Sequence, residues 1–405
     1  MEKKRVFEGV KVVDFTQAAT GPLATKYLAD NGATVIHIES RVRPDVARVS
    51  GPFKDNVSDP DMSAWFPNWS TNKLGITLNM SFPEAKEILW KLIMWGDVLV
   101  ESFSPGVMGR WGVGYEGVRE KRPDIVYVST CQMGQYGPWS QFRGYGTHGA
   151  FFAGFPELIG WPDRLPSWFY VPHNDWVSVR TLAVALIGAL AYRRKTGRGQ
   201  HIDQAQMEAA SHLLAPVLMD YAVNCRIQTR DGNRLPGAAP HSAYPCRGHE
   251  RWVAIAVTTD EEWQAFCKVI GEPSWTKDPK FSTLLARKEN EDDLNALVGE
   301  WTIDFLAEEV MAKMQAAGVP AGVVQTNEDL FKDPQLRHRG HWVVMEHPRI
   351  GPYSFDAAAF KLSKTPMELK TPGPVLGQHN DYVYREILGM CDEQIEDCLV
   401  KGVFE

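Results

Sequence analysis

Hydrophobic and polar positions in the first half of the chain alternate between short apolar runs and longer segments with helical spacing. The apolar runs predict four buried strands, over residues 10–15, 34–39, 97–101 and 125–129. The clearest helical spacing lies over residues 83–95. Short apolar strands separated by helices predict a parallel sheet that helices cover on both faces, and so an α/β fold.

Further along the chain, a long apolar helix is predicted from near Asp175 to a glycine-rich stop at residues 195–199. Residues 200–204 are expected to form a strand, and residues 207–223 a further helix. The composition then changes near Asp231, where Gly and Pro mark a linker. This change predicts the end of the first domain.

The part after the linker has the pattern of a smaller α+β domain, which we place at residues 226–334. Strands are predicted over 252–257 and 319–324, with helices over 290–301 and 304–317. The tail that follows is rich in Pro and Gly and ends in a helix over residues 392–401. A chain of 405 residues normally forms more than one domain, which agrees with this division.

Charge and cysteine content narrow the class of protein. The net charge of −7 argues against a general nucleic-acid binder, which needs a basic face. The six cysteines are dispersed without a CxxC pair, and the first residues lack the apolar stretch of a signal peptide. The apolar run over 181–192 is too short to span a bilayer. These features predict a soluble enzyme of the reduced cytoplasm, with no membrane partner.

Two short motifs are open to a cofactor or metal interpretation. Residues 144–149 match GxGxxG, but the seven residues before them have the chemistry of a loop, whereas a dinucleotide site follows a strand directly. His338 and His341 form an HxxH without further ligands, so we interpret them as solvated and predict no metal site. Cys131 lacks a nucleophile signature, and we interpret it as a structural thiol.

Asp175 lies where an extended Pro-containing segment meets the long apolar helix. Two interpretations fit this position. The carboxylate can cap the N-terminus of the helix, or it can serve as a covalent nucleophile in a site that excludes water. Spacing alone favours the cap.

Several segments in order resemble family III CoA-transferases of the CaiB/BaiF type, and the resemblance covers nearly the whole chain. The strongest matches are residues 7–16 with Gly21-Pro22, 32–39, 72–73, 100–106 and 195–200. Weaker ones are residues 244–246, 318–322 and 376–379.

The resemblance implies a fold and a chemistry. The fold is a Rossmann-like large domain over residues 1–225, completed by residues 335–405, with two subunits interlocked as a dimer. The family's catalytic aspartate falls on Asp175, which would accept the acyl group of a CoA thioester as an anhydride and then carry CoA as a thioester. This raises the nucleophile interpretation above the cap interpretation, although both can hold.

The resemblance also implies a site for coenzyme A, which enters as the acyl-CoA substrate. Arg110 and Arg143 would meet its phosphates, with Arg41 as a third cation, because arginine suits phosphate contacts. The residues expected to line the site are Asn72, Lys73, Leu78, Ser102, Phe103 and Tyr145.

Departures from the formyl-CoA branch bear on the substrate. Ala19 stands where that branch has a glutamine, with Gln17 two residues earlier, and residues 237–241 replace its tetraglycine loop. We therefore expect succinyl-CoA as donor and an aryl- or alkylsuccinate as acceptor, as in aromatic degradation, in a homodimer or a heteromer of related subunits. Aromatic residues available to wall such a site are Trp65, Trp69, Trp161, Trp168 and Trp176.

Two alternatives on the same fold stay open. One is an acyl-CoA racemase, whose histidine base would fall at Tyr145, three residues before His148. Neutral tyrosine is a poor base, which counts against this alternative. The other is a non-catalytic subunit of a heteromeric transferase, against which the retained Asp175 argues. The sequence leaves the roles of Gln17 and His148 open.

Overall fold

The computed structural model describes residues 5–168 and 170–405, which divide into two compact units. The larger unit comprises Met1–Phe155, Trp168–Ile227 and Leu336–Glu405. The smaller unit comprises Pro156–Ser167 and Gln228–Gln335. The C-terminal segment therefore belongs to the same unit as the first half of the chain.

The larger unit is built on a six-stranded parallel sheet in the order β3-β2-β1-β4-β5-β6, the strand order of a Rossmann fold. The predicted α/β class is confirmed. The strands are β1 (Lys11–Phe15), β2 (Thr34–Glu39), β3 (Leu74–Thr77), β4 (Val98–Glu101), β5 (Val126–Cys131) and β6 (Gln200–Ala205). Sequence analysis did not predict β3, which has only four residues and includes Gly75.

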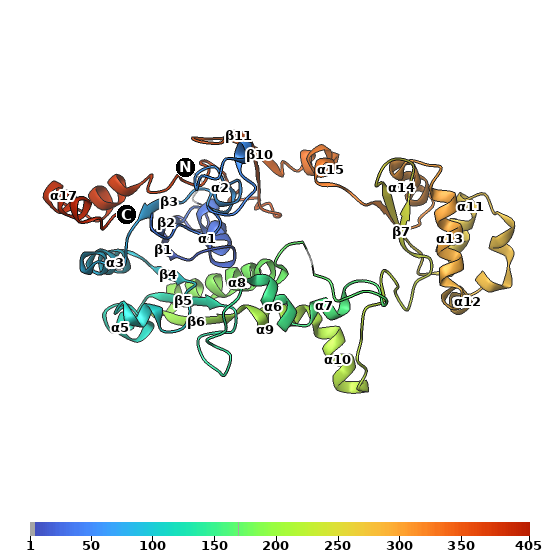
Figure 1. The fold of residues 1–405 in the computed structure, drawn as a ribbon, viewed down its shortest axis with the longest axis horizontal. Helices are drawn as coiled ribbons and strands as arrows, with labels where there is room; N and C mark the ends of the chain where they lie inside the picture. Colours follow the sequence, from blue (N-terminus) through green and yellow to red (C-terminus); the bar gives the residue numbers. More distant parts are fainter. Residues whose placement is uncertain (1–4, 169) are drawn as a thin grey trace. The chain divides into compact units, whose positions relative to one another are not determined.

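Helices cover both faces of this sheet (Figure 1). On one face, α1 (Thr20–Asp30) and α8 (His173–Thr196) pack on apolar residues of β1, β2, β4 and β5. On the other face, α3 (Pro83–Trp95) and α17 (Asp392–Lys401) close a second core. The strands are buried on both sides, which is why they appear in the sequence as unbroken apolar runs.

The C-terminal segment is tied to the edge strand β3. The backbone N–H of Gly75 donates to His379 Nδ1 at 3.0 Å, and the hydroxyl of Tyr384 donates to the carbonyl of Thr77 at 2.6 Å. Residues more than 300 positions away thus bond backbone N–H and C=O groups on the outer edge of β3, which would otherwise have no partner in the sheet.

Helix α8 has 24 residues, which is long and apolar enough to cross a membrane by length and composition alone. Its residues Leu182 and Leu186 are fully buried in the core beside α1. A buried core helix passes the same test of length and composition, so this helix is weak evidence for a membrane span.

The single helix predicted over residues 207–223 is wrong, because the segment is broken. It forms α9 (Gln206–Ser211), a 3-10 turn (His212–Leu214) and α10 (Ala215–Asn224). Pro216 stands in the first turn of α10, where its missing N–H is tolerated, whereas inside one long helix it would remove a hydrogen bond.

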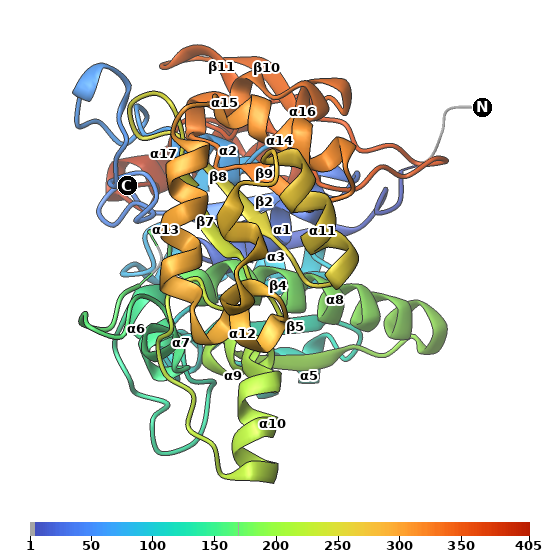
Figure 2. The ribbon, with the colours of Figure 1, turned by 90° about the vertical axis from the view of Figure 1, so that its right-hand side faces the viewer.

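The smaller unit is α+β, as the pattern predicted. Its antiparallel sheet has the order β7-β8-β9, with strands His241–Pro245, Trp252–Ala256 and Ala321–Val323. One face packs against helices of the same unit (Figure 2). Those helices are α11 (Asp260–Val269), α13 (Glu291–Thr302) and α14 (Ala307–Ala316).

Candidate active site

The candidate active site lies at the carboxyl edge of the large sheet, where its strand order reverses between β1 and β4. Parallel strands all end at one edge, and ligands of open α/β sheets bind at such a reversal. The backbone N–H of Gln17, just after β1, donates to Ser102 Oγ, just after β4, at 2.8 Å. This bond joins the two loops that flank the reversal.

Asp175 lies at this same edge, in the first turn of α8, and the residue is only 8 % exposed. The helix begins after Pro172, and no side chain caps it. The interpretation of Asp175 as the N-cap is therefore wrong, because the residue already lies within the helix. Its own backbone is fixed from α1, since Thr20 Oγ1 donates to the Asp175 carbonyl at 3.3 Å.

The carboxyl group of Asp175 is poorly solvated. Burial raises its pKa to about 7, although a hydrogen bond from Gln132 acts in the opposite direction. Gln132 Nε2 lies 3.5 Å from Asp175 Oδ1, and across residues 5–168 and 170–405 it is the one side-chain donor to this carboxylate. A desolvated carboxylate with few hydrogen bonds keeps its lone pairs available for attack on a carbonyl carbon.

The GxGxxG motif is explained by close packing rather than by a dinucleotide. Gly144 lies in a loop, while Gly146 and Gly149 belong to the short helix α6 (Gly146–Phe152). A side chain at Gly146 would overlap the carboxyl group of Asp175, and one at Gly149 would overlap the amides of Asn174 and Gln132. Glycine at these two positions lets α6 lie directly against the start of α8.

The loop after β1 is held by a hydrogen bond to the buried carboxyl group of Asp45. Ala18 has a φ of +65°, and its N–H donates to Asp45 Oδ1 at 2.9 Å. Burial raises the pKa of Asp45 to about 6. This contact holds the backbone between Gln17 and Ala19 in a left-handed conformation that a non-glycine residue adopts only at a cost.

The three arginines predicted to bind phosphates all follow strands at the carboxyl edge. Arg41 follows β2, Arg110 ends the short helix α4 (Val107–Arg110) after β4, and Arg143 lies between β5 and α6. All three are exposed, and Arg41 Nη2 lies 3.4 Å from the carbonyl of Leu376. Arg110 and Arg143 form no ion pair with any residue that the structure describes, so their guanidinium groups are available to a ligand.

Ser102, Phe103 and Tyr145 also lie at this edge. The ring of Phe103 packs edge-on against Phe15 and Trp111, with centroid distances of 5.2 and 5.1 Å, and its backbone N–H donates to the buried Glu101. Tyr145 is 68 % exposed at the start of α6. Ser102 and Phe103 thus follow β4 directly, next to the reversal, whereas Tyr145 lies in the segment between β5 and α6.

Three other residues predicted to line the nucleotide site are used inside the protein. Lys73 is 1 % exposed and donates to Asp14, Pro22 and Thr25, each at 2.8 Å. The amide of Asn72 bonds to Asp30 and to the backbone of residues 368–371. Leu78 is 1 % exposed in the core. The structure thus places these side chains differently from the implied nucleotide pocket.

The remaining candidates have separate places. His148 Nδ1 accepts the Tyr145 N–H at 3.2 Å, so one ring nitrogen is occupied at the start of α6.

Burial raises the pKa of Cys131 to about 11, which makes a thiolate there unfavourable. Gln132 and Asn174 were not predicted, although the position of Gln132 immediately after a strand was a usable signal.

Three of the five predicted tryptophans form a cluster, which includes Trp176, the residue after Asp175. Trp65 and Trp69, both on α2 (Trp65–Trp69), stack with centroids 5.2 Å apart, and Trp176 packs edge-on against Trp69 at 5.9 Å. Trp161 belongs to the smaller unit, and Trp168 is exposed in the larger unit. The cluster therefore joins α2 to the start of α8.

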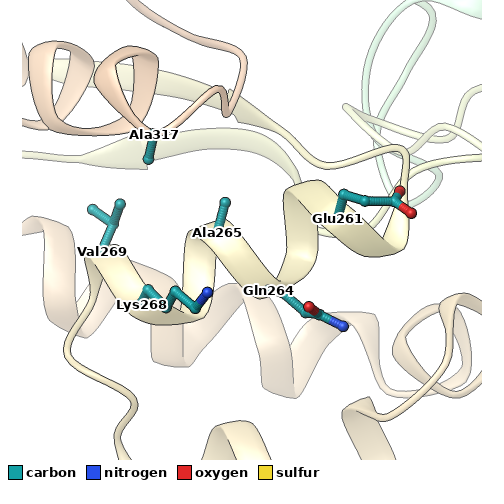
Figure 3. A pocket seen from close by; sticks show the side chains of 6 residues that line it. All are labelled: Glu261, Gln264, Ala265, Lys268, Val269 and Ala317. Atoms are coloured by element: carbon teal, nitrogen blue, oxygen red, sulfur yellow. The ribbon is translucent and has the colours of Figure 1, made fainter.

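A separate groove on the smaller unit shares no residue with this site (Figure 3). It follows one side of α11 and is open to solvent. Its lining residues are Glu261, Gln264, Ala265, Lys268, Val269 and Ala317. The groove offers one carboxylate and one ammonium group, and we assign it no part in the chemistry.

The fold and the site together define an α/β protein with a buried carboxylate at the strand-order reversal. The chain belongs to CoA-transferase family III, since the model of that family matches residues 7–380. It is a CoA-transferase, which acts on an acyl-CoA and a carboxylic acid.

Individual relatives match along nearly the whole chain. Succinyl-CoA–D-citramalate CoA-transferase of Chloroflexus aurantiacus is 29% identical, with 98% of each chain covered. Formyl-CoA:oxalate CoA-transferase of Rhodopseudomonas palustris is 30% identical over 99% of this chain and 97% of the relative. A crystal structure of a CAIB/BAIF family protein from Brucella suis superposes with a TM-score of 0.87 at 28% identity, covering 95% of this chain and all of that one.

We expect Arg110→Ala and Arg143→Ala to raise the KM for acyl-CoA about tenfold or more while changing kcat less than threefold. Phosphate contacts distant from the reacting carbonyl act about equally on the ground state and the transition state. Steady-state kinetics with varied acyl-CoA measures this split. Arg198→Ala is the matched control, because Arg198 is exposed at the opposite edge, just before β6. A loss of kcat at unchanged KM in both variants would contradict the assignment.

Proposed function

We propose that this chain transfers CoA from succinyl-CoA to an aryl- or alkylsuccinate, with Asp175 as the covalent carrier. The observation that carries the proposal is the buried carboxyl group of Asp175, which lies at the strand-order reversal with one weak side-chain donor. Such a group can form an acyl anhydride that stays protected from water.

The proposed reaction has two halves. A carboxylate oxygen of Asp175 attacks the thioester carbonyl carbon, the C–S bond breaks and CoA leaves as the thiolate. The thiolate then attacks the side-chain carbonyl carbon of Asp175, and the donor acid leaves as its carboxylate. The acceptor acid reverses both steps with the aspartyl thioester, so the free energy of the CoA bond is conserved.

Two observations support succinyl-CoA and a larger acceptor. Relatives of similar identity are named for succinyl-CoA with citramalate, glutarate or malate, all dicarboxylic acids. Trp176, the residue after Asp175, packs against the stacked Trp65 and Trp69, and an aromatic cluster of this kind would suit an aryl or alkyl substituent. Ala19 stands in place of the glutamine of the formyl-CoA branch, which also supports substrates other than formyl-CoA and oxalate.

We also propose that the enzyme works in the cytoplasm as an interlocked dimer of this chain, or with a related subunit. All six cysteines are free thiols, which supports a reducing compartment. Helix α10 buries none of its residues within its own unit, and it exposes Leu218, Met219, Tyr221 and Val223. An apolar helix of this kind is typical of a surface that a second chain covers.

The test is CoA exchange by the purified chain. Succinyl-CoA or formyl-CoA is supplied as donor with benzylsuccinate, an alkylsuccinate, glutarate, malate or oxalate as acceptor, and new CoA thioesters are measured by mass spectrometry. We expect the highest kcat/KM with the substituted succinates. Formyl-CoA and oxalate as the best pair would contradict the proposed substrates.

The same preparation separates the two alternatives. A racemase would exchange the α-proton of an acyl-CoA with deuterium from solvent in the absence of a second acid. A non-catalytic subunit would show neither exchange nor transfer alone. We expect transfer without α-deuteration, because Tyr145 is exposed and one ring nitrogen of His148 is already occupied.

A further inference from the structure

A chain of amide side chains, with Asn174 and Gln206 buried and Gln132 partly buried, links the ends of β5 and β6 to the carboxylate of Asp175. Gln132 directly follows β5, and Gln206 directly follows β6. Gln132 Nε2 donates to Gln206 Oε1 at 2.8 Å, and Asn174 Nδ2 donates to Gln132 Oε1 at 2.9 Å. The reaction described above assigns these amides no role in its steps.

The two bonds fix which end of the Gln132 amide faces Asp175. Its oxygen is held by Asn174, and one of its two N–H groups is held by Gln206, so the second N–H is left for Asp175 Oδ1 at 3.5 Å. Turning the amide over would place its oxygen against both a carboxylate and the Gln206 oxygen. Electrostatic repulsion disfavours that arrangement, and the N–H therefore points at the nucleophile.

The packing around the amides leaves them little freedom. Asn174 is fully buried, and a side chain at Gly149 of α6 would overlap both the Asn174 and the Gln132 amide. A donor that is fixed before the reaction begins loses little free energy to reorganisation as charge develops. A resting distance of 3.5 Å is at the outer limit of a hydrogen bond, and such catalytic bonds tighten when the reaction begins.

We propose that Gln132 is a catalytic hydrogen-bond donor that stabilises the oxyanion formed on Asp175 itself. The inference rests on the proposed role of Asp175 as the carrier. When the CoA thiolate attacks the side-chain carbonyl carbon of Asp175, the C=O electron pair moves onto Oδ1, which the Gln132 N–H faces. The pair returns as the bond from that carbon to the donor acyl carboxylate breaks, and the acid leaves as an anion.

Gln132→Met tests the proposal because it keeps the length and volume of the side chain and removes the N–H. We expect kcat to fall about 10²-fold, the usual loss for one oxyanion donor, with the acyl-CoA KM changed less than threefold. The acid limb of the pH–kcat/KM profile should also move to higher pH. In wild type the Gln132 N–H stabilises the ionised form of Asp175, so its removal raises the pKa of Asp175.

Gln204→Leu is the matched control. Gln204 is also a partly buried glutamine of this sheet edge, but it donates to Ser178 and Thr181 on α8 and not to the carboxylate. We expect it to lower thermal stability while leaving kcat and the pH profile within threefold of wild type. A kcat loss in the control equal to that of Gln132→Met would show that buried amides here act through packing, and would overturn the proposal.

Failure of this inference and failure of the carrier assignment give different results. Hydroxylamine added during turnover should convert Asp175 to its hydroxamate in wild type and in Gln132→Met, as mass spectrometry of the peptide over residues 170–180 would show. A trapped Asp175 with wild-type kcat and pH profile in Gln132→Met would overturn the donor role alone. If Asp175 stays unmodified during transfer, the carrier assignment fails first. Thermal melting identifies a variant that does not fold, and Gln132→Leu, which also lacks the N–H and adds no charge, then replaces Gln132→Met with the same expectations.

Discussion

Asp175→Asn should abolish CoA transfer, by at least about 10³-fold, and should also make the folded chain more stable above pH 7. The amide has the size of the carboxyl group but cannot form the anhydride. Because Asp175 is not the N-cap of α8, neither Asn nor Ala at this position removes a helix cap. The loss of activity therefore reports on the chemistry alone.

The direction of the stability change follows from the pKa. Burial raises the pKa of Asp175 from 3.8 in the unfolded chain to about 7, so the folded state holds its proton more tightly. The cost of ionising the buried group is absent below about pH 4, grows as the pH rises, and is complete above about pH 7. A shift of this size corresponds to at most about 4 kcal/mol, and we expect about 2–4 kcal/mol of stabilisation in Asp175→Asn at pH 8.

Urea unfolding at pH 4, 6 and 8, with transfer assays on the same samples, measures both effects. Asp175→Ala should lose activity to the same extent but gain less stability, because it leaves a small cavity. Near-normal transfer by Asp175→Asn would contradict the carrier assignment. If the stability difference between Asp175→Asn and wild type is the same at pH 8 as at pH 4, the burial of an ionisable group at this position is contradicted.

The large sheet was predictable because its strands are buried on both faces and therefore appear as unbroken apolar runs. β3 escaped prediction because it has four residues with a glycine among them, and the groups that bond its outer edge come from the distant C-terminal segment. The break between α9 and α10 was readable in principle, since Pro216 marks it. Apolar spacing on both sides of the proline concealed the break.

The site was less predictable than the fold. Asp175 came from the resemblance, since spacing favoured a cap that the structure does not contain. The glycines of the GxGxxG motif carried a real signal, but their role depends on α8 packing against α6, which local sequence does not show. Lys73 shows the same limit, because position along the chain does not reveal that its side chain points into the core.

Lys73→Met should lower the free energy of unfolding by about 3–5 kcal/mol, because it leaves the carboxylate of Asp14 buried without its cation. The Lys73 ammonium is 2.8 Å from Asp14 Oδ2, and both side chains are fully buried. Its other two N–H groups are taken by Pro22 and Thr25, so nothing from solvent can replace the contact.

The effect should depend on pH in a definite direction. Burial alone would raise the pKa of Asp14, but Lys73 and His37 outweigh it and hold the pKa well below its usual value. A lowered pKa contributes stability above the unfolded pKa of about 4, and this stability is lost as the pH falls further. The difference between wild type and Lys73→Met should therefore be largest at neutral pH and shrink towards pH 3.

Two further variants separate this structural role from nucleotide binding. Asp14→Asn combined with Lys73→Met removes both charges and should recover much of the lost stability. Lys86→Met, at an exposed position on α3, is the control and should change the free energy of unfolding by less than about 0.5 kcal/mol. The acyl-CoA KM of folded Lys73→Met should stay within threefold of wild type, because the ammonium is not available to a phosphate. A stability loss below about 1 kcal/mol together with a tenfold higher KM would reverse the conclusion and return Lys73 to the nucleotide site that the family resemblance implies.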